Sequence, residues 1–238
     1  MLGRSFSCPT SRASGAHEID SLATAIQSSS MMKIRSICLT AASIFALLST
    51  AGAQESKKEA VSIFNGKDLS GWKAPNNNTW WKVIDGAIVC ESGPKKKGSN
   101  LWTEKEYKDF ILEAEFKFDG KGDTGIHLRT EKQQMQIGIS GSLKRDMTCS
   151  MYIPGKGYPE EAMVPGSDKK GVEGLLKIND WNQVKIEAKK NNYRIWLNGK
   201  LVFKYTSEKA PEKGPIGLQL HGGKVMRADF RNLKITEL

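Results

Sequence analysis

The stretch "DFILEAEFKF", Asp109 to Phe118, alternates apolar and polar side chains over most of its length. Successive side chains of a β-strand point to opposite faces, so this period predicts a strand with one buried face. The buried face is predicted to hold Phe110, Leu112, Ala114, Phe116 and Phe118, and the opposite face Ile111, Glu113, Glu115 and Lys117. The segment therefore predicts a sheet that covers a core on one side only.

Strand and turn signals continue on both sides of this segment. "WWKVIDGAIVC" (80–90) holds two short runs joined by Asp85-Gly86, a pair that type I′ hairpins prefer. Residues 181–206 predict three strands that turn at Asn191-Asn192 and Asn198-Gly199, and residues 214–238 predict two more. Because no long helical period follows residue 53, we predict one all-β domain over 61–238, an antiparallel sandwich of two sheets. Lys144–Ile178, rich in glycine, proline and charge, is predicted to be a long surface loop.

The N-terminal region carries an export signal. Lys33 and Arg35 precede the apolar run Ile37–Leu48, which Ala51-Gly52-Ala53 follows. This pattern predicts a signal peptide over 31–53, cleaved after Ala53, and a secreted or periplasmic protein with no membrane anchor after cleavage. Residues 1–30 are interpreted as an upstream extension foreign to the mature protein, and 54–60 as a linker.

Charge and cysteine content narrow the range of partners. The net charge is +10, but the lysines are scattered and alternate with apolar residues, so nucleic-acid binding is not predicted. Cys90 and Cys149 are the cysteines beyond the signal peptide. One pair does not make a disulfide framework in a domain of this size, and we favour two free thiols.

Polar side chains that could act in catalysis or binding fall on the outward face of several predicted strands. "GDTGIHLRT" (122–130) puts Gly125, His127 and Arg129 on one face, opposite Ile126 and Leu128. If the strands share one sheet, its outer face carries Glu115, His127, Arg129, Gln136, Gln219 and His221, with Gln134 beside Gln136. Gly125, Gly138 and Gly217 on this face indicate that something approaches the backbone closely. Each of these residues alone is more often an ordinary surface residue than a functional one. Only their combination on one face predicts a cleft.

The sequence contains no motif for zinc binding, phosphate binding or a serine nucleophile. There is no His/Cys cluster at zinc spacing, no phosphate-binding glycine loop and no Ser in a G-x-S-x-G turn. Glu113 and Glu115 lie two strand steps apart, which permits the spacing of a retaining glycosidase pair but does not predict it.

The chain resembles the 3-keto-disaccharide hydrolase family from Val61 to Leu238. The resemblance rests on "FNGKDLSGWK", "WKVIDGAIV", "LWTEKEYKDFILEAEFKF", "GDTGIHLR", "WNQVKIEAKKNNYRIWLNGKLV" and "GPIGLQLHGG…DFRNLKITEL", in this order. It implies a concanavalin A-like jelly roll with little helix, and an enzyme that acts on an oligosaccharide or glycoside substrate. The family often has Glu before the Q-I of "E-x-Q-I", where this chain has Gln134.

The implied reaction is cleavage of a 3-keto-glycoside by removal of the C2 proton, elimination and addition of water. We expect His127 or His221 as the base, Arg129 to stabilise the enolate, and Glu115 as the acid or an orienting group. Gln134, Gln136, Gln219 and Trp102 are expected to bind the sugar. No cofactor is expected, and a divalent ion held by Glu115 and a histidine is left open as a replacement for Arg129. The alternative function is a lectin-like module that binds carbohydrate without turnover; two histidines favour the enzyme.

Overall fold

The computed structural model describes residues 58–166 and 171–238. The chain divides into two units, Met1–Gln54 and Glu55–Leu238, and the description concerns the second. The predicted extension 1–30, the signal peptide 31–53 and residues 54–57 of the linker lie outside the described residues. Within the described ranges, no helix is long and apolar enough to cross a membrane.

In residues 58–166 and 171–238, fourteen strands form two antiparallel sheets, which we call sheet A and sheet B. Sheet A contains β1 (Val61–Ser62), β3 (Trp81–Ile84), β4 (Ala87–Glu91), β6 (Phe110–Phe118), β10 (Asn182–Lys189), β11 (Asn192–Leu197), β12 (Lys200–Thr206) and β14 (Arg227–Glu237). Sheet B contains β2 (Trp72–Lys73), β5 (Ser99–Tyr107), β7 (Asp123–Leu128), β8 (Gln134–Gly138), β9 (Met151–Tyr152) and β13 (Gly214–Leu220).

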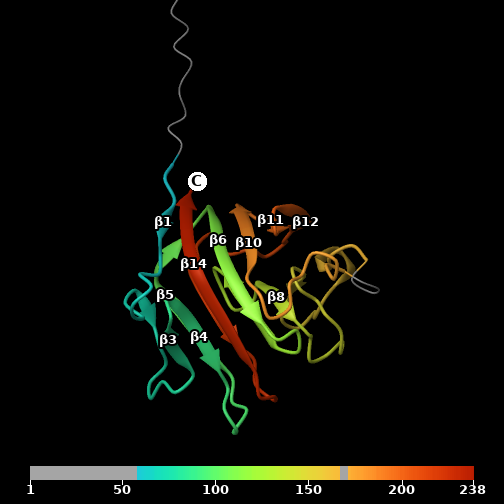
Figure 1. The fold of residues 1–238 in the computed structure, drawn as a ribbon. Helices are drawn as coiled ribbons and strands as arrows, with labels where there is room; N and C mark the ends of the chain where they lie inside the picture. Colours follow the sequence, from blue (N-terminus) through green and yellow to red (C-terminus); the bar gives the residue numbers. More distant parts are fainter. Residues whose placement is uncertain (1–57, 167–170) are drawn as a thin grey trace, which may run out of the picture. The chain divides into compact units, whose positions relative to one another are not determined.

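The strand order places segments that are distant in the sequence side by side. Sheet A runs β12-β11-β10-β6-β14-β4-β3, with β1 on β14, and sheet B runs β2-β5-β13-β7-β8-β9. Sheet A faces the viewer in Figure 1, where β4, β14, β6 and β10 lie next to one another. The helix in the described part of the chain is the 3-10 turn Glu160–Ala162. The predicted fold class, an all-β concanavalin A-like jelly-roll sandwich of two antiparallel sheets, is confirmed.

The core lies between the sheets and is filled by the inward positions of both. All five apolar side chains predicted for the buried face of β6 are buried, each with 4% or less of its surface exposed. Sheet B contributes from the opposite side, with fully buried residues at Leu101, Ile126, Leu128, Met135, Ile137, Ile216 and Leu218. Burial of this apolar area is the main favourable term for folding.

The predicted hairpin turns are close to those observed. Asp85 and Gly86 have φ of 50° and 74°, and Asn198 and Gly199 have φ of 48° and 83°, as a type I′ turn requires. The turn between β10 and β11 lies one residue earlier than predicted, because Lys190 adopts the positive φ of 53°.

The segment Lys144–Ile178 is more deeply packed than the surface loop predicted. It contributes β9 to the edge of sheet B, and it buries Met147, Cys149, Met151 and Val164. The prediction failed because glycine, proline and charge dominate the segment, although Met147, Cys149 and Met151 stand at alternate positions. Cys149 and Cys90 are both buried and both free, so the preference for free thiols is confirmed.

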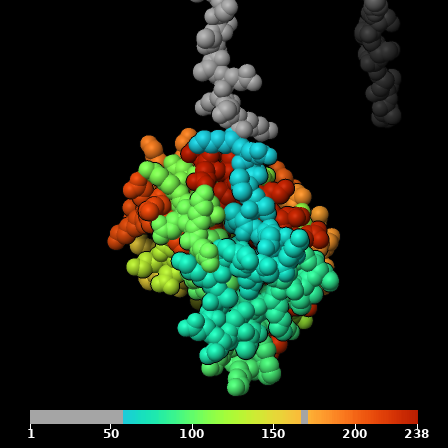
Figure 2. Space-filling view, turned by 90° about the vertical axis from the view of Figure 1, so that its left-hand side faces the viewer, coloured from blue at the N-terminus to red at the C-terminus, as the bar shows by residue number. Residues whose placement is uncertain are grey.

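The described N-terminal segment closes one edge of the sandwich. β1 pairs with β14, with Val61 opposite Ile235. Figure 2 shows this segment in cyan against red residues of the C-terminal strand. The indole of Trp72 anchors it by donating a hydrogen bond of 2.8 Å to the Ile63 carbonyl.

Candidate functional site

The outer face of sheet B carries the polar residues that the alternation predicted. His127 on β7 lies opposite Gly217 on one side and Gln134 on the other, and Gly217 lies opposite Trp102. In the next row along the sheet, Gly125 lies between Gln219 and Gln136. All four predicted substrate-binding residues, Trp102, Gln134, Gln136 and Gln219, therefore share one face with His127.

Two glycines on this face let long side chains lie flat across the sheet. A Cβ at Gly125 would come within 2.5 Å of the Gln134 amide nitrogen, and a Cβ at Gly217 within 2.5 Å of the Trp102 ring. The prediction that these glycines permit a close approach is confirmed, but the approaching groups are side chains of the protein itself.

A chain of side-chain amides crosses the face. Gln134 and Gln219 exchange two hydrogen bonds, each of 2.9 Å, between their amide groups. Gln134 also donates to Gln136 at 3.1 Å, and Gln136 donates to the Asp123 carboxylate at 2.8 Å. Because the members hold one another, the network presents a fixed set of donors and acceptors.

Asp123 ends this network and was missed by the sequence analysis. Its carboxylate is almost fully buried, accepts the Gly141 N–H at 2.9 Å, and lies 3.9 Å from Nδ1 of His221. Asp123 belongs to the same alternating set as Gly125 and His127 in "GDTGIHL", so the period could have revealed it. The prediction overlooked it because Asp123 stands at the strand end beside a turn.

His221 follows β13 and is the exposed histidine of the face. Half of its side-chain surface is accessible, and its backbone N–H donates to the Asp123 carbonyl at 3.3 Å. Nδ1 lies 2.6 Å from the Gly222 carbonyl oxygen. That contact requires the proton on Nδ1, which leaves Nε2 with a free lone pair.

A cleft of about 600 Å³ lies over this end of the face, and we call it the sheet B cleft. Its floor is Asp123, Gln134, Gln136, Gln219 and His221, and its walls include Ser140, Ser142, Lys144, Tyr152, Tyr158 and Lys224. Tyr152 and Tyr158 meet edge to face with ring centroids 5.3 Å apart. Burial raises the pKa of the Tyr158 hydroxyl above its usual range, so this group stays protonated as a donor.

His127 lies on the predicted face but outside the sheet B cleft. Trp102 stacks on its imidazole, with ring centroids 4.9 Å apart and planes at 21°, and the histidine is 2% exposed. Neither ring nitrogen has a hydrogen-bond partner. Burial lowers the pKa of His127 to about 4. The expectation that His127 faces solvent is wrong, because an indole over Gly217 covers it.

Trp102 was expected to stack on a sugar ring. One of its faces is occupied by His127, and the cleft residues do not include it.

The Arg129 side chain does not point outward. The expectation that it lies beside the enolate is therefore wrong. Its φ of 66° breaks the alternation after β7, and its side chain is fully buried. The guanidinium donates to the carbonyls of Ala188, Lys190 and Pro211, and to Asp109 at 3.2 Å. It therefore ties the end of β7 to the turn between β10 and β11, away from the cleft.

Glu115 lies on sheet A, so its expected place beside the histidines is wrong as well. On the outer face of β6 it accepts a 2.6 Å hydrogen bond from Arg231. A divalent ion shared between Glu115 and either histidine is excluded, because the two sheets and their core separate these residues. Among residues 58–166 and 171–238, no group of three or more His, Cys, Asp and Glu side chains could hold a metal ion.

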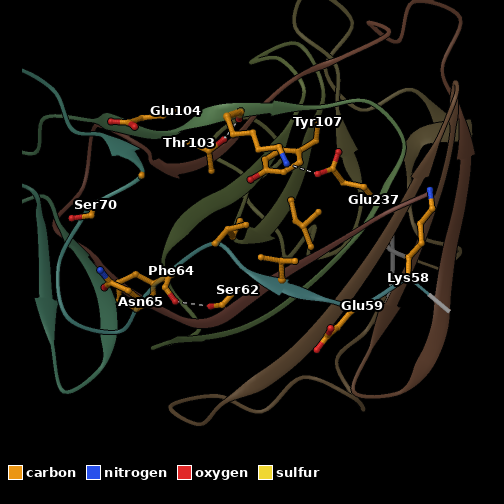
Figure 3. Close-up of a pocket in the computed structure, with 15 residues that line it drawn as sticks. Lys58, Glu59, Ser62, Phe64, Asn65, Ser70, Thr103, Glu104, Tyr107 and Glu237 are labelled. Carbon is orange, nitrogen blue, oxygen red and sulfur yellow. Dashed lines mark hydrogen bonds and ion pairs between the residues drawn. The ribbon is translucent and has the colours of Figure 1, made fainter. Parts of the chain in front are cut away.

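Another hollow, of about 620 Å³, opens where β1 meets the edge of sheet B (Figure 3). Tyr107, Phe64 and Thr103 line it, and an ion pair between Lys105 and Glu237 crosses its rim. It holds no histidine and none of the residues predicted for the site. The sheet B cleft is therefore the better candidate.

Comparison with solved structures supports the fold class. The chain is similar to two structures of a putative glycosyl hydrolase from Parabacteroides distasonis. One is 20% identical, with 74% of this chain and 92% of that chain covered and a TM-score of 0.53. The other is 23% identical, with 75% and 84% covered and a TM-score of 0.55. At these identities the likeness shows a shared sandwich fold. No curated protein matches the chain.

The model of one protein family covers almost all of the described domain. Residues 59–236 match the 3-keto-alpha-glucoside-1,2-lyase-like domain, and the chain belongs to this family. The resemblance noted in the sequence is thereby confirmed, and family and fold support a carbohydrate-related function.

Proposed function

We propose that the protein cleaves the glycosidic bond of 3-keto-glycosides in the sheet B cleft. The observation that carries the proposal is the pairing of exposed His221 with buried Asp123, 3.9 Å apart, at the end of the amide network. An imidazole with a free ring nitrogen beside a carboxylate is suited to act as a general base. Membership of the 3-keto-alpha-glucoside-1,2-lyase-like family supports the same reaction class.

The first step forms an enolate. The ketone at C3 acidifies the hydrogen at C2, and Nε2 of His221 takes this proton while the electron pair moves into the C2–C3 bond and onto the C3 oxygen. The buried carboxylate of Asp123 stabilises the resulting imidazolium. The Tyr158 hydroxyl and the second N–H of the Gln219 amide, which the network does not use, stabilise the enolate oxygen, as fixed dipoles do in an oxyanion hole.

The second step breaks the bond at C1. The enolate re-forms the ketone, a C1–C2 double bond appears, and the C1 oxygen departs with its electron pair and accepts the proton that His221 took from C2, which returns the imidazole to its neutral form. Water then adds across the double bond, with hydroxyl at C1 and hydrogen at C2. Elimination and hydration are together redox-neutral, so no oxidant or reductant is consumed. The predictions of no cofactor and of export after cleavage at Ala53 stand as parts of this proposal.

The test is turnover of a p-nitrophenyl 3-keto-glucoside beside its unoxidised parent. We expect release of nitrophenol from the keto sugar alone, and a loss of about 10²–10⁴-fold in rate for His221→Ala. Asp123→Asn should lose rate with little change in KM, because the carboxylate acts through the histidine.

The lectin-like alternative predicts a different result. If the protein binds both sugars and turns over neither, the proposed enzyme activity is wrong and the protein is a carbohydrate-binding module. Turnover that survives unchanged in His221→Ala would contradict the assignment of the base.

A further inference from the structure

The outer face of sheet A carries a further hollow, on the opposite side of the sandwich from the sheet B cleft. This hollow, which we call the sheet A groove, has a volume of about 550 Å³. Its side chains come from four neighbouring strands, namely Glu113 and Glu115 of β6, Gln183 and Lys185 of β10, Trp196 of β11, and Asn232 and Lys234 of β14. The proposed reaction uses none of them.

The sheet is irregular at two places beside the groove, with one extra residue in β14 and one in β12, the neighbour of β11. The β11–β12 register shifts between Ile195 and Trp196, and the β14–β6 register shifts between Arg231 and Lys234. Asn232 within the second bulge has a φ of 53°. Bulges re-aim side chains and are common beside functional sites. Here the bulge in β14 places Asn232 at the hollow, whereas Trp196 reaches the same hollow through the regular alternation of β11.

An aromatic platform forms one wall. Trp196 is half-buried on the outer face, with Lys185 Nζ 5.1 Å and Arg194 Cζ 5.0 Å from its ring centroid. These cations hold the indole in place through cation–π attraction. Trp181 lies on the same face, beyond Gln183, with Arg231 Cζ 3.9 Å from its ring centroid. A rigid indole with an apolar ring and a polar edge suits a ligand that has both apolar and polar surface.

The charges that line the groove alternate, and its two lysines balance its two glutamates. Across the strands, Lys185 and Lys234 lie on either side of Glu113. In the next row, Gln183 and Arg231 lie on either side of Glu115. Such a surface offers donors and acceptors side by side, which suits hydroxyl groups because each can donate and accept. Glu113 and Glu115 would repel a polyanion, and Lys185 and Lys234 would repel a cation.

From these four observations we propose that the sheet A groove is a second, non-catalytic binding site for neutral polysaccharide, with Trp196 as its platform. The site would hold the protein on a polymer while the sheet B cleft, on the opposite sheet, remains free. Binding in the groove does not depend on the chemistry proposed for the cleft.

The experiment is native affinity electrophoresis in gels that contain one neutral polysaccharide each: starch, laminarin, xyloglucan, galactomannan or hydroxyethyl cellulose. We expect at least one of them to retard the wild-type protein and His221→Ala equally. Trp196→Ala should lose the retardation, and Gln183→Ala should weaken it while leaving the fold intact. Lys189→Ala, on the same sheet but outside the groove, is the matched control.

Three results would overturn the proposal. If none of the neutral gels retards the protein, the groove does not bind neutral polysaccharide. Retardation lost in His221→Ala but kept in Trp196→Ala would assign the binding to the cleft. Retardation only in alginate or carboxymethyl cellulose gels would show attraction of polyanions by net charge. Circular dichroism of each variant identifies a loss caused by unfolding, in which case Gln183→Ala decides.

Discussion

The two histidines of the folded domain differ in environment although they share one sheet face. Opposite His127 lies Gly217, over which Trp102 folds, whereas opposite His221 lies Asp123 at the open end of the sheet. Alternation placed both on this face, because strand period depends only on local sequence. It could not distinguish the covered histidine from the open one, because the cover comes from another strand.

His127 is predicted to make the protein sensitive to acid. Its pKa is about 4 in the folded state against 6.5 for a free side chain, so the unfolded state binds more protons between these values. Stability should therefore fall as the pH drops from about 6.5 to about 4, by about 3 kcal/mol in total. Urea unfolding across this range measures it.

His127→Phe serves as the comparison for this pH effect, since it keeps a ring under Trp102 and removes the titrating group. The variant should show a flatter pH profile than the wild-type protein. Identical slopes in the two proteins would contradict the assignment.

Gln134 carries an amide donor that a carboxylate lacks, and this donor makes two hydrogen bonds of the network. Gln134→Glu removes the hydrogen bonds to Gln136 and Gln219 and leaves their oxygens without a donor. We expect a loss of about 1–3 kcal/mol in the free energy of unfolding at neutral pH. The loss should shrink in acid, where a protonated Glu can donate. Equal stability of variant and wild type at pH 7 would show that the network rearranges freely.

At the scale of the elements, β7 shows where pattern-based prediction ends. The alternation from Asp123 to Leu128 is regular, with Ile126 and Leu128 in the core. The next residue, Arg129, adopts a φ of 66°, and its side chain turns to the carbonyls around Lys190. Those carbonyls lie about 60 residues away in the sequence, so no local pattern predicts the exit from the strand.

Arg129 is therefore predicted to stabilise the fold without a role in chemistry. Arg129→Met leaves Asp109 and three carbonyls without the guanidinium, and should lower the free energy of unfolding by about 3–5 kcal/mol. The cleavage rate per folded molecule should remain that of the wild type. A rate loss in a variant of undiminished stability would restore Arg129 as an enolate stabiliser.

At the scale of the whole molecule, the sequence predicts the strands well and their assignment to sheets poorly. Glu115 alternates as regularly as His127, but β6 pairs with β10 and β14 in sheet A, while β7 pairs with β8 and β13 in sheet B. Pairing is decided by how the whole chain winds, which strand periodicity does not encode. One cleft predicted from the sequence is thus divided between two opposite faces.

Glu115→Gln tests this division. The Arg231 and Glu115 side chains of this pair are 38% and 16% exposed, and the amide of the variant can still accept from Arg231, so the change should cost about 1 kcal/mol of stability. The cleavage rate of a 3-keto-glycoside in the sheet B cleft should not change. A large fall in kcat would mean that sheet A takes part in the reaction.

Proton removal at C2 by His221 is the central claim, and hydrogen exchange tests it most directly. A 3-keto-glucoside in D₂O is followed by NMR with the wild-type protein, His221→Ala and His127→Phe. We predict that the wild type and His127→Phe exchange the C2 hydrogen at similar rates, and that His221→Ala loses the exchange. Exchange that persists in His221→Ala and disappears in His127→Phe would contradict the account.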